Sequence, residues 1–99
     1  MTFEDVSKRG LVLLGCGKMG SAMLAGWLDG GAGAGLPPAS VHVIDPMPSD
    51  WLRGTGVAIN AGLPVNPAIV LIAVKPQMMA EALPAIGGFG SDTLFISVA

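Results

Sequence analysis

Short apolar runs alternate with helical repeats along this chain. Leu11–Leu14 is a continuous apolar run that a glycine ends, which is typical of a strand buried on both faces in a parallel sheet. In residues 18–28 the apolar side chains Met19, Met23 and Trp27 recur every four positions, and this spacing predicts one helix. The first part of the chain is therefore expected to form a strand, a loop and a helix.

The remaining residues continue this alternation. Residues 41–45 are rich in β-branched side chains and end at Pro46, so they predict a second strand. Residues 69–74 form another buried strand, which Lys75 and a proline stop. The pattern implies an α/β fold with a doubly wound parallel sheet and right-handed crossovers. Further expected elements are a helical turn at residues 49–53, a strand at 57–59, a helix at 77–86, a strand at 93–98 and a flexible connection over 30–40.

The composition is unusually apolar for one small domain. Of the 99 residues, 52% are hydrophobic and 12% are charged, so we expect something else to cover part of the apolar surface. The net charge of -2 and the five scattered Lys and Arg argue against nucleic acid as a partner. The longest apolar run, residues 68–74, is far shorter than the ~20 residues of a membrane span. With an acidic N-terminus and a single cysteine, the chain is expected to be cytoplasmic.

A loop with three glycines joins the first predicted strand to the first predicted helix. This is the context that a dinucleotide-binding glycine motif requires. Gly15 would make the tight turn, Gly17 would let the main chain approach a pyrophosphate, and Gly20 would let the helix lie close to the strand. The alternative is an ordinary strand-to-helix turn. The candidate cofactor-binding residues of the loop are Gly15, Cys16, Gly17, Lys18, Met19 and Gly20.

Asp45 ends the second predicted strand. Its carboxylate can accept hydrogen bonds from the adenosine ribose hydroxyls and would repel the 2′-phosphate of NADP, so it favours NAD. The alternative is a turn aspartate before a proline. Lys75 ends the next buried strand and could neutralise a phosphate, line the nicotinamide side through its main chain, or be only a charged strand terminus. Gly15, Asp45 and Lys75 would all lie at the carboxyl ends of parallel strands, where open α/β sheets bind ligands.

The chain offers no catalytic residue and no metal site by sequence. Cys16 occupies a variable position of the glycine loop, where we expect the side chain to point near the cofactor while the main chain binds it. The only histidine, His42, is expected on a strand surface rather than beside the cysteine, so a nucleophile and base pair is not predicted.

Three motifs together resemble the N-terminal domain of pyrroline-5-carboxylate reductases. They are Gly-Cys-Gly-Lys-Met-Gly-Ser-Ala-Met at residues 15–23, Asp-Pro at 45–46 and Ala-Val-Lys-Pro-Gln at 73–77, and the end of the chain resembles the start of the next loop. The resemblance covers nearly the whole chain, and the third motif is the most specific. It implies a Rossmann-type sheet in which residues 1–99 form the NAD(P)-binding domain.

The resemblance also implies a reaction and a division of roles. Enzymes of that family reduce pyrroline-5-carboxylate to proline with NADH or NADPH, as part of proline biosynthesis. By resemblance, residues 15–20 would hold the pyrophosphate and Asp45 the adenosine ribose, which gives an expected preference for NADH. The nicotinamide-proximal wall would consist of Ala73, Val74, Lys75 and Pro76.

The family's substrate pocket, its proton-donating hydroxyl and its homo-oligomeric contact belong to a helical C-terminal domain. The chain stops just after a predicted strand, so we expect it to be the N-terminal part of a longer enzyme. Two positions depart from the family pattern. Neither Asn60 nor Asn66 can be assigned to the asparagine that many relatives carry before the Ala-Val-Lys-Pro strand, and Ala68 stands where relatives often have an acid.

Two other functions are compatible with these residues. A 3-hydroxyacid-type dehydrogenase shares the glycine loop but would take its catalytic residues from a different second domain, and Ala-Val-Lys-Pro-Gln argues against it. A non-catalytic nucleotide-binding module would use the same fold without chemistry.

Overall fold

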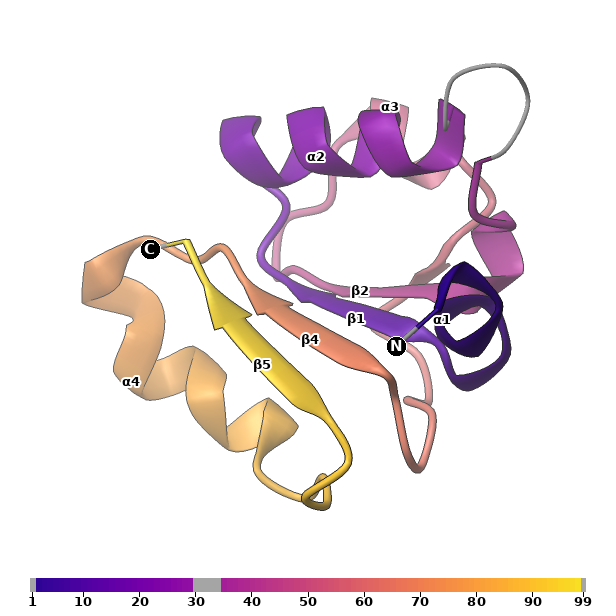
Figure 1. The fold of residues 1–99 in the computed structure, drawn as a ribbon. Helices are drawn as coiled ribbons and strands as arrows, with labels where there is room; N and C mark the ends of the chain where they lie inside the picture. Colours follow the sequence, from indigo (N-terminus) through magenta and orange to yellow (C-terminus); the bar gives the residue numbers. More distant parts are fainter. Residues whose placement is uncertain (1, 30–34, 99) are drawn as a thin grey trace.

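A computed structural model describes residues 2–29 and 35–98 and contains one parallel sheet in the order β3-β2-β1-β4-β5 (Figure 1). The chain moves outward from β1 to β3 and then returns to the other side of β1 to form β4. This reversal makes the space between the ends of β1 and β4 the topological switch point. The predicted doubly wound class is therefore confirmed. The strands are β1 (Leu11–Leu14), β2 (Val41–Ile44), β3 (Ala58–Ile59), β4 (Ile69–Ile72) and β5 (Leu94–Ser97).

Helices cover both faces of the sheet, with α2 and α3 on one face and α4 on the other (Figure 1). The side chains of each strand alternate between two cores. Leu11 and Leu13 pack into the cluster that contains Leu24 of α2, whereas Val12 and Leu14 pack into the other cluster. The period of two residues is the reason a continuous apolar run can fill both sides of a sheet. The helices are α1 (Phe3–Arg9), α2 (Lys18–Asp29), α3 (Asp50–Arg53) and α4 (Met79–Ala82).

Helix α1 was not predicted, although its ends carry ordinary helix signals. The Thr2 hydroxyl accepts a hydrogen bond from the N–H of Asp5 at 3.1 Å and caps the helix. Asp5 and Arg9 form an ion pair one turn apart at 3.0 Å. The helix lacks the long apolar period that marks α2, because seven residues make barely two turns.

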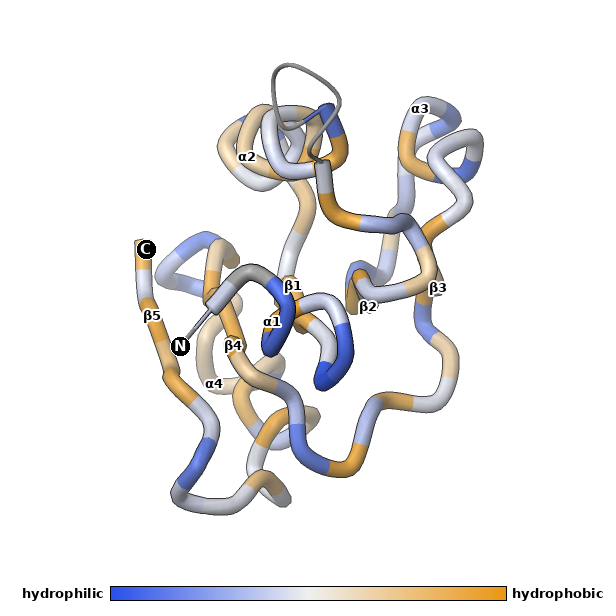
Figure 2. Tube along the Cα trace, turned by 45° about the vertical axis from the view of Figure 1, so that its right-hand side comes forward, coloured by the Kyte–Doolittle hydropathy of each residue, from blue (hydrophilic) through white to orange (hydrophobic). Residues whose placement is uncertain are grey.

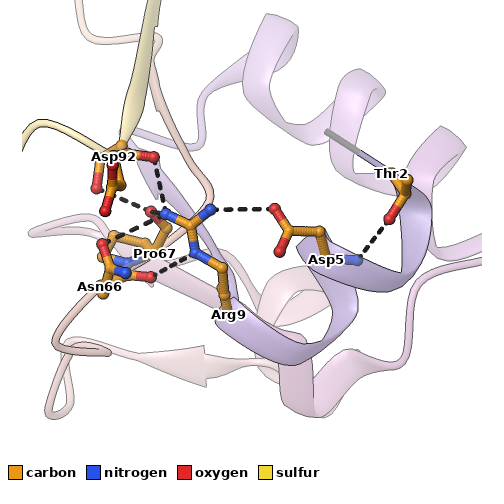
Figure 3. A network of polar contacts seen from close by, with 7 residues as sticks. Thr2, Asp5, Arg9, Asn66, Pro67 and Asp92 are labelled. Atoms are coloured by element: carbon orange, nitrogen blue, oxygen red, sulfur yellow. Dashed lines mark hydrogen bonds and ion pairs between the residues drawn. The ribbon is translucent and has the colours of Figure 1, made fainter.

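Arg9 connects the end of α1 to two distant segments (Figure 3). Its guanidinium donates to the carbonyl oxygens of Asn66, Pro67 and Asp92 at 3.1, 3.2 and 2.8 Å. It also donates to the side chains of Asn66 and Asp5. One side chain therefore joins α1 to the segments that lead into β4 and β5, at the amino end of the sheet.

The helix predicted at residues 77–86 is present, but it is α-helical only in its middle. Its α-helical part, α4, spans four residues and is flanked by 3-10 turns at Pro76–Met78 and Leu83–Ile86. Pro84 lacks an N–H donor, and its ring would clash with the carbonyl four residues earlier, so a regular helix cannot continue through it. Ile86 is nevertheless buried against the second core cluster.

Among the described residues, strand β5 pairs only with β4 and lies at the edge of the sheet (Figure 2). All four of its residues are exposed, and among them are the apolar side chains of Leu94, Phe95 and Ile96. Part of the apolar surface expected from the composition is found here. No helix among the described residues is long and apolar enough to cross a membrane. The first five residues of the predicted connection over residues 30–40 fall outside the described residues, and its last part forms a 3-10 turn at Pro38–Ser40.

Candidate cofactor site

The turn after β1 depends on Gly15. This residue has a φ of 89°, and a Cβ atom there would lie 2.8 Å from Cγ1 of Val74. Its N–H donates to the carbonyl of Ile44 at 2.8 Å. A Cβ at Gly20 would lie 2.7 Å from the carbonyl oxygen of Gly15. Both glycines are thus required for the tight turn and for the close approach of α2 to it.

Gly17 differs from these two glycines because the space that a side chain would occupy is open. A Cβ atom at Gly17 would meet no atom within 4 Å, so packing within the described residues does not require a glycine there. Gly17, Lys18 and Met19 are exposed at the start of α2. The first N–H groups of a helix have no acceptor within the helix, and they attract anions. An open glycine beside these groups fits the close approach of a pyrophosphate.

The Asp45 carboxylate joins the end of β2 to the glycine loop. Its Oδ2 accepts from the N–H of Cys16 at 2.8 Å, and its Oδ1 accepts from the N–H of Met47 at 2.9 Å. The second contact is the turn interaction that an aspartate before proline often makes. The first contact spans 29 residues of sequence and could not be read from the local pattern. Asp45 is half-buried.

The Cys16 side chain does not point in the predicted direction. Its side chain is only 6% exposed and belongs to the core cluster beneath α2 instead of facing a cofactor. Burial raises the pKa of the thiol, the hydrogen bond with Ser21 opposes this effect, and the nearby Asp45 charge adds to it. The Sγ lies 3.5 Å from the Ser21 hydroxyl oxygen. A protonated and buried thiol is a poor nucleophile, so Cys16 contributes to packing and, through its N–H, to the contact with Asp45.

The end of β4 lies beside the glycine loop. The N–H of Ala73 donates to the carbonyl of Leu14 at 2.8 Å, which continues the sheet past the last residue of β4. Val74 faces Gly15 as described above, while Lys75 and Pro76 are exposed. The structure therefore brings the loop after β1 together with the segment after β4, at the switch point where doubly wound sheets bind ligands.

Asn60 is a further residue of this edge, and no role was predicted for it. Its side chain forms two hydrogen bonds with the main chain of Asp45. The other asparagine, Asn66, lies at the opposite end of the sheet and contacts Arg9. No sequence signal separates the two asparagines, because their contacts depend on which strands are neighbours. In the described part of the chain no group of three His, Cys, Asp or Glu could hold a metal ion.

The fold and the glycine loop define an α/β domain of the Rossmann type. Residues 10–99 match the family model described as "NADP oxidoreductase coenzyme F420-dependent", and the chain belongs to this family.

Two named proteins are similar to the chain. It is 34% identical over 95 residues to the pyrroline-5-carboxylate reductase of Haemophilus influenzae. Its fold matches a crystal structure of Plasmodium falciparum pyrroline carboxylate reductase with NADP bound, with a TM-score of 0.69 and 21% identity. The comparisons cover 90% and 93% of this chain but only 34% of each of those proteins. The resemblance predicted from the three motifs is confirmed, and the chain spans about a third of the length of these relatives.

Proposed function

We propose that residues 1–99 are the NAD(P)H-binding domain of a pyrroline-5-carboxylate reductase. The observation that carries this proposal is the contact between the glycine loop and the end of β4. A Cβ atom on Gly15 would lie within 3.1 Å of main-chain atoms of Val74, so two of the motifs of the resemblance meet at the switch point. The curated relative of known name is a pyrroline-5-carboxylate reductase, which supports the same activity.

The residues of the loop have separate roles in this proposal. The exposed main chain at Gly17, Lys18 and Met19 holds the pyrophosphate at the start of α2. Gly15, Gly20 and the N–H of Cys16 shape the loop from beneath. The segment from Ala73 to Pro76 lines the nicotinamide side. A bound nicotinamide cofactor supplies the hydride, and these residues bind and orient it.

The preference between NADH and NADPH is assigned to Asp45. A carboxylate at the end of β2 accepts hydrogen bonds from a ribose diol and repels a 2′-phosphate, so NADH is the favoured cofactor. The nearest basic residue further along the chain, Arg53, lies at the end of α3 and is exposed. The relative of known structure was crystallised with NADP. Asp45→Ser should shift the preference toward NADPH, and an unchanged ratio of the two affinities would remove Asp45 from ribose recognition.

The rest of the reaction is assigned to a further domain. In this proposal a helical C-terminal domain supplies the pyrroline-5-carboxylate pocket, the catalytic proton donor and the contact between copies of a homo-oligomer. The enzyme acts in the cytoplasm in proline biosynthesis, and it uses neither nucleic acid nor a membrane as a partner. The low share of Lys and Arg, five in 99 residues, supports the exclusion of nucleic acid.

Calorimetric titration of the 99-residue chain with NADH and with NADPH at fixed ionic strength tests cofactor binding. We expect binding of both, with tighter binding of NADH. Tighter binding of NADPH would keep the domain assignment and overturn the preference. A folded chain that binds neither cofactor would overturn the proposed site.

The two alternatives are separated by turnover. The full-length encoded protein should oxidise NADH in the presence of pyrroline-5-carboxylate and form proline. Turnover of a 3-hydroxyacid instead would assign the related dehydrogenase. Cofactor binding without turnover of either substrate would favour a nucleotide-binding module.

A further inference from the structure

The Asn60 side chain extends the sheet at the edge that carries the candidate site. Its Oδ1 accepts from the N–H of Asp45 at 2.9 Å, and its Nδ2 donates to the carbonyl oxygen of Asp45 at 2.7 Å. The N–H of Asn60 donates to the carbonyl of Val43 at 2.8 Å. Regular pairing of β2 with β3 ends at Val43 and Ile59. The side-chain amide therefore takes the place of the next main-chain partner and holds Asp45 by both of its main-chain groups.

Asp45, held in this way, contacts the glycine loop in turn. With its main chain held by Asn60, its carboxylate accepts from the N–H groups of Cys16 and Met47. These contacts form a continuous line from the end of β3 through the end of β2 to the loop after β1. A carboxylate has about four lone-pair positions on its two oxygens, and these two contacts use only part of them. Since Asp45 is half-buried, its carboxylate keeps capacity for a hydroxyl of a ligand.

We propose that Asn60 is a positioning residue for cofactor recognition, acting through Asp45 on the glycine loop. It fixes the direction of the Asp45 carboxylate, so that one group both accepts from the ribose and holds the Cys16 N–H. Ribose recognition and the shape of the pyrophosphate loop are then coupled. This inference rests on the proposed function, because its effects are measured as cofactor affinity.

The chemistry of the position explains why asparagine serves it. The side-chain amide offers one acceptor and two donors on a short stem, so it can bond both an N–H and a carbonyl oxygen of the same residue. Asn60 also has a φ of 50°, a left-handed conformation that asparagine tolerates better than most other residues. Aspartate would keep the acceptor but lose the donor. Glycine would keep the backbone conformation and lose both contacts.

The test uses Asn60→Gly with Asn66→Gly as the matched control. Asn66 is the other asparagine that follows β3, and it contacts Arg9 at the opposite end of the sheet. Both variants lose the same side chain, but only one loses contact with Asp45. Wild type and variants are titrated with NADH and with NADPH. A circular dichroism spectrum and an unfolding midpoint verify that each chain is folded.

We expect Asn60→Gly to bind NADH about tenfold more weakly. Because the carboxylate loses its direction, the affinity for NADH should fall more than the affinity for NADPH. The dissociation constant of NADPH divided by that of NADH should therefore fall about threefold or more. Asn66→Gly should keep both affinities and the ratio. A general loss of stability would weaken binding of both cofactors alike, so the ratio distinguishes positioning from a structural role. Asn60→Asp should give a smaller loss, because it keeps one of the two contacts.

Coupling to Asp45 gives a second readout. In an Asp45→Ala background, Asn60→Gly should have no further effect on NADH affinity, because the group that it positions is absent. If Asn60→Gly does not fold, the Asn60→Asp comparison in the same two backgrounds replaces it. Folded Asn60 variants with wild-type affinity and ratio, or additive effects with Asp45→Ala, would overturn the inference. A wild-type chain that binds neither cofactor would instead overturn the proposed function on which it rests.

Discussion

Strands β1 and β5 are two four-residue strands of the same sheet, both rich in apolar side chains, with opposite surroundings. Every residue of β1 is buried, and Leu13 is completely inaccessible. Every residue of β5 is exposed, and Leu94 keeps 48% of its accessible surface. The first strand has a neighbour on each side and a core on each face, whereas the second has one neighbour. The comparison shows that burial in this molecule follows position in the sheet rather than the hydrophobicity of the segment.

The polar contacts divide in a similar way. At the ends of β3, β2 and β1, the side chains of Asp45 and Asn60 connect three segments at the carboxyl edge of the sheet. At β5, the pairing continues with the N–H of Val98 bonded to Ile72, and the Arg9 contact with Asp92 holds the segment before the strand. Because more contacts hold the part of the sheet that carries the candidate site, we expect β5 to open more readily.

The largest expected difference is in the core. Leu13→Ala should lower the free energy of unfolding by about 2 to 5 kcal/mol, because it leaves a cavity in a fully buried position. Leu94→Ala removes the same atoms from an exposed position and should cost less than about 1 kcal/mol. Urea unfolding of both variants measures the difference. Equal losses would mean that β5 is buried in solution and would break the comparison.

The glycine loop allows a similar comparison between an enclosed position, Gly15, and an open one, Gly17. Gly15→Ala should lower the free energy of unfolding by about 1 to 3 kcal/mol, because its φ is positive and its Cβ would contact Val74. Gly17→Val should leave the fold intact, since a Cβ there meets nothing within 4 Å.

The effect of Gly17→Val should appear in ligand binding instead. We expect NADH affinity to fall more than tenfold, which corresponds to about 1.4 kcal/mol or more, because the branched side chain occupies the approach to the main chain. Calorimetric titration measures this change. Unchanged affinity in a folded variant would show that the loop is only a turn.

A substitution of Arg9 tests how far the stability of β5 depends on the hydrogen bonds that Arg9 makes. Arg9→Met should lower the free energy of unfolding by about 1 to 2 kcal/mol and speed hydrogen exchange in β5, because several charge-assisted hydrogen bonds are lost. Lys8→Met is the control, since the Lys8 and Glu4 side chains are 74% and 75% exposed. Its cost should stay within about 0.5 kcal/mol. Slower or unchanged exchange in β5 of the Arg9 variant would contradict this role.

The smallest effect concerns His42 in β2. Burial lowers the pKa of this histidine below its ordinary value of 6.5, and its Nδ1 is buried without a partner among the described residues. The unfolded chain therefore takes up the proton at a higher pH than the folded chain. The contribution of the neutral ring is fully present above pH 6.5 and is lost as the pH falls through the lowered pKa.

Unfolding midpoints between pH 7 and pH 5 measure this contribution. His42→Gln should flatten the dependence of stability on pH in this range, because His42 is the only histidine of the chain. A wild-type slope that persists in the variant would assign the effect to other groups.

Much of the fold follows from local patterns. The apolar runs that predicted β1, β2 and β4 mark strands within two residues of their observed ends, because an inner parallel strand needs apolar side chains on both faces. The four-residue spacing of apolar side chains likewise predicted α2. Helix α1 was missed because its signals are polar and lie only at its ends. The helix predicted at residues 77–86 is present, but Pro84 prevents a regular α-helix beyond α4.

The candidate site was predictable to a similar extent. Gly15, Asp45 and Lys75 were expected at one edge, and the structure places them at the ends of neighbouring strands. The direction of the Cys16 side chain was predicted wrongly. Side chains along a strand alternate between the two faces of the sheet, but the loop after β1 interrupts this alternation before Cys16. The contact of Asn60 with Asp45 could not be predicted, since the two residues meet only when β2 and β3 pair.

By itself, the sequence determined the class of fold, the glycine loop and the family resemblance, because each depends on residues close together in the chain. The tertiary structure alone decided which glycines are enclosed, where the Asp45 carboxylate points and which apolar strand remains exposed. These properties depend on neighbours that lie tens of residues away in sequence, as with the 29 residues between Cys16 and Asp45. Such neighbours are brought together by strand order, and that order follows from the packing of the whole sheet.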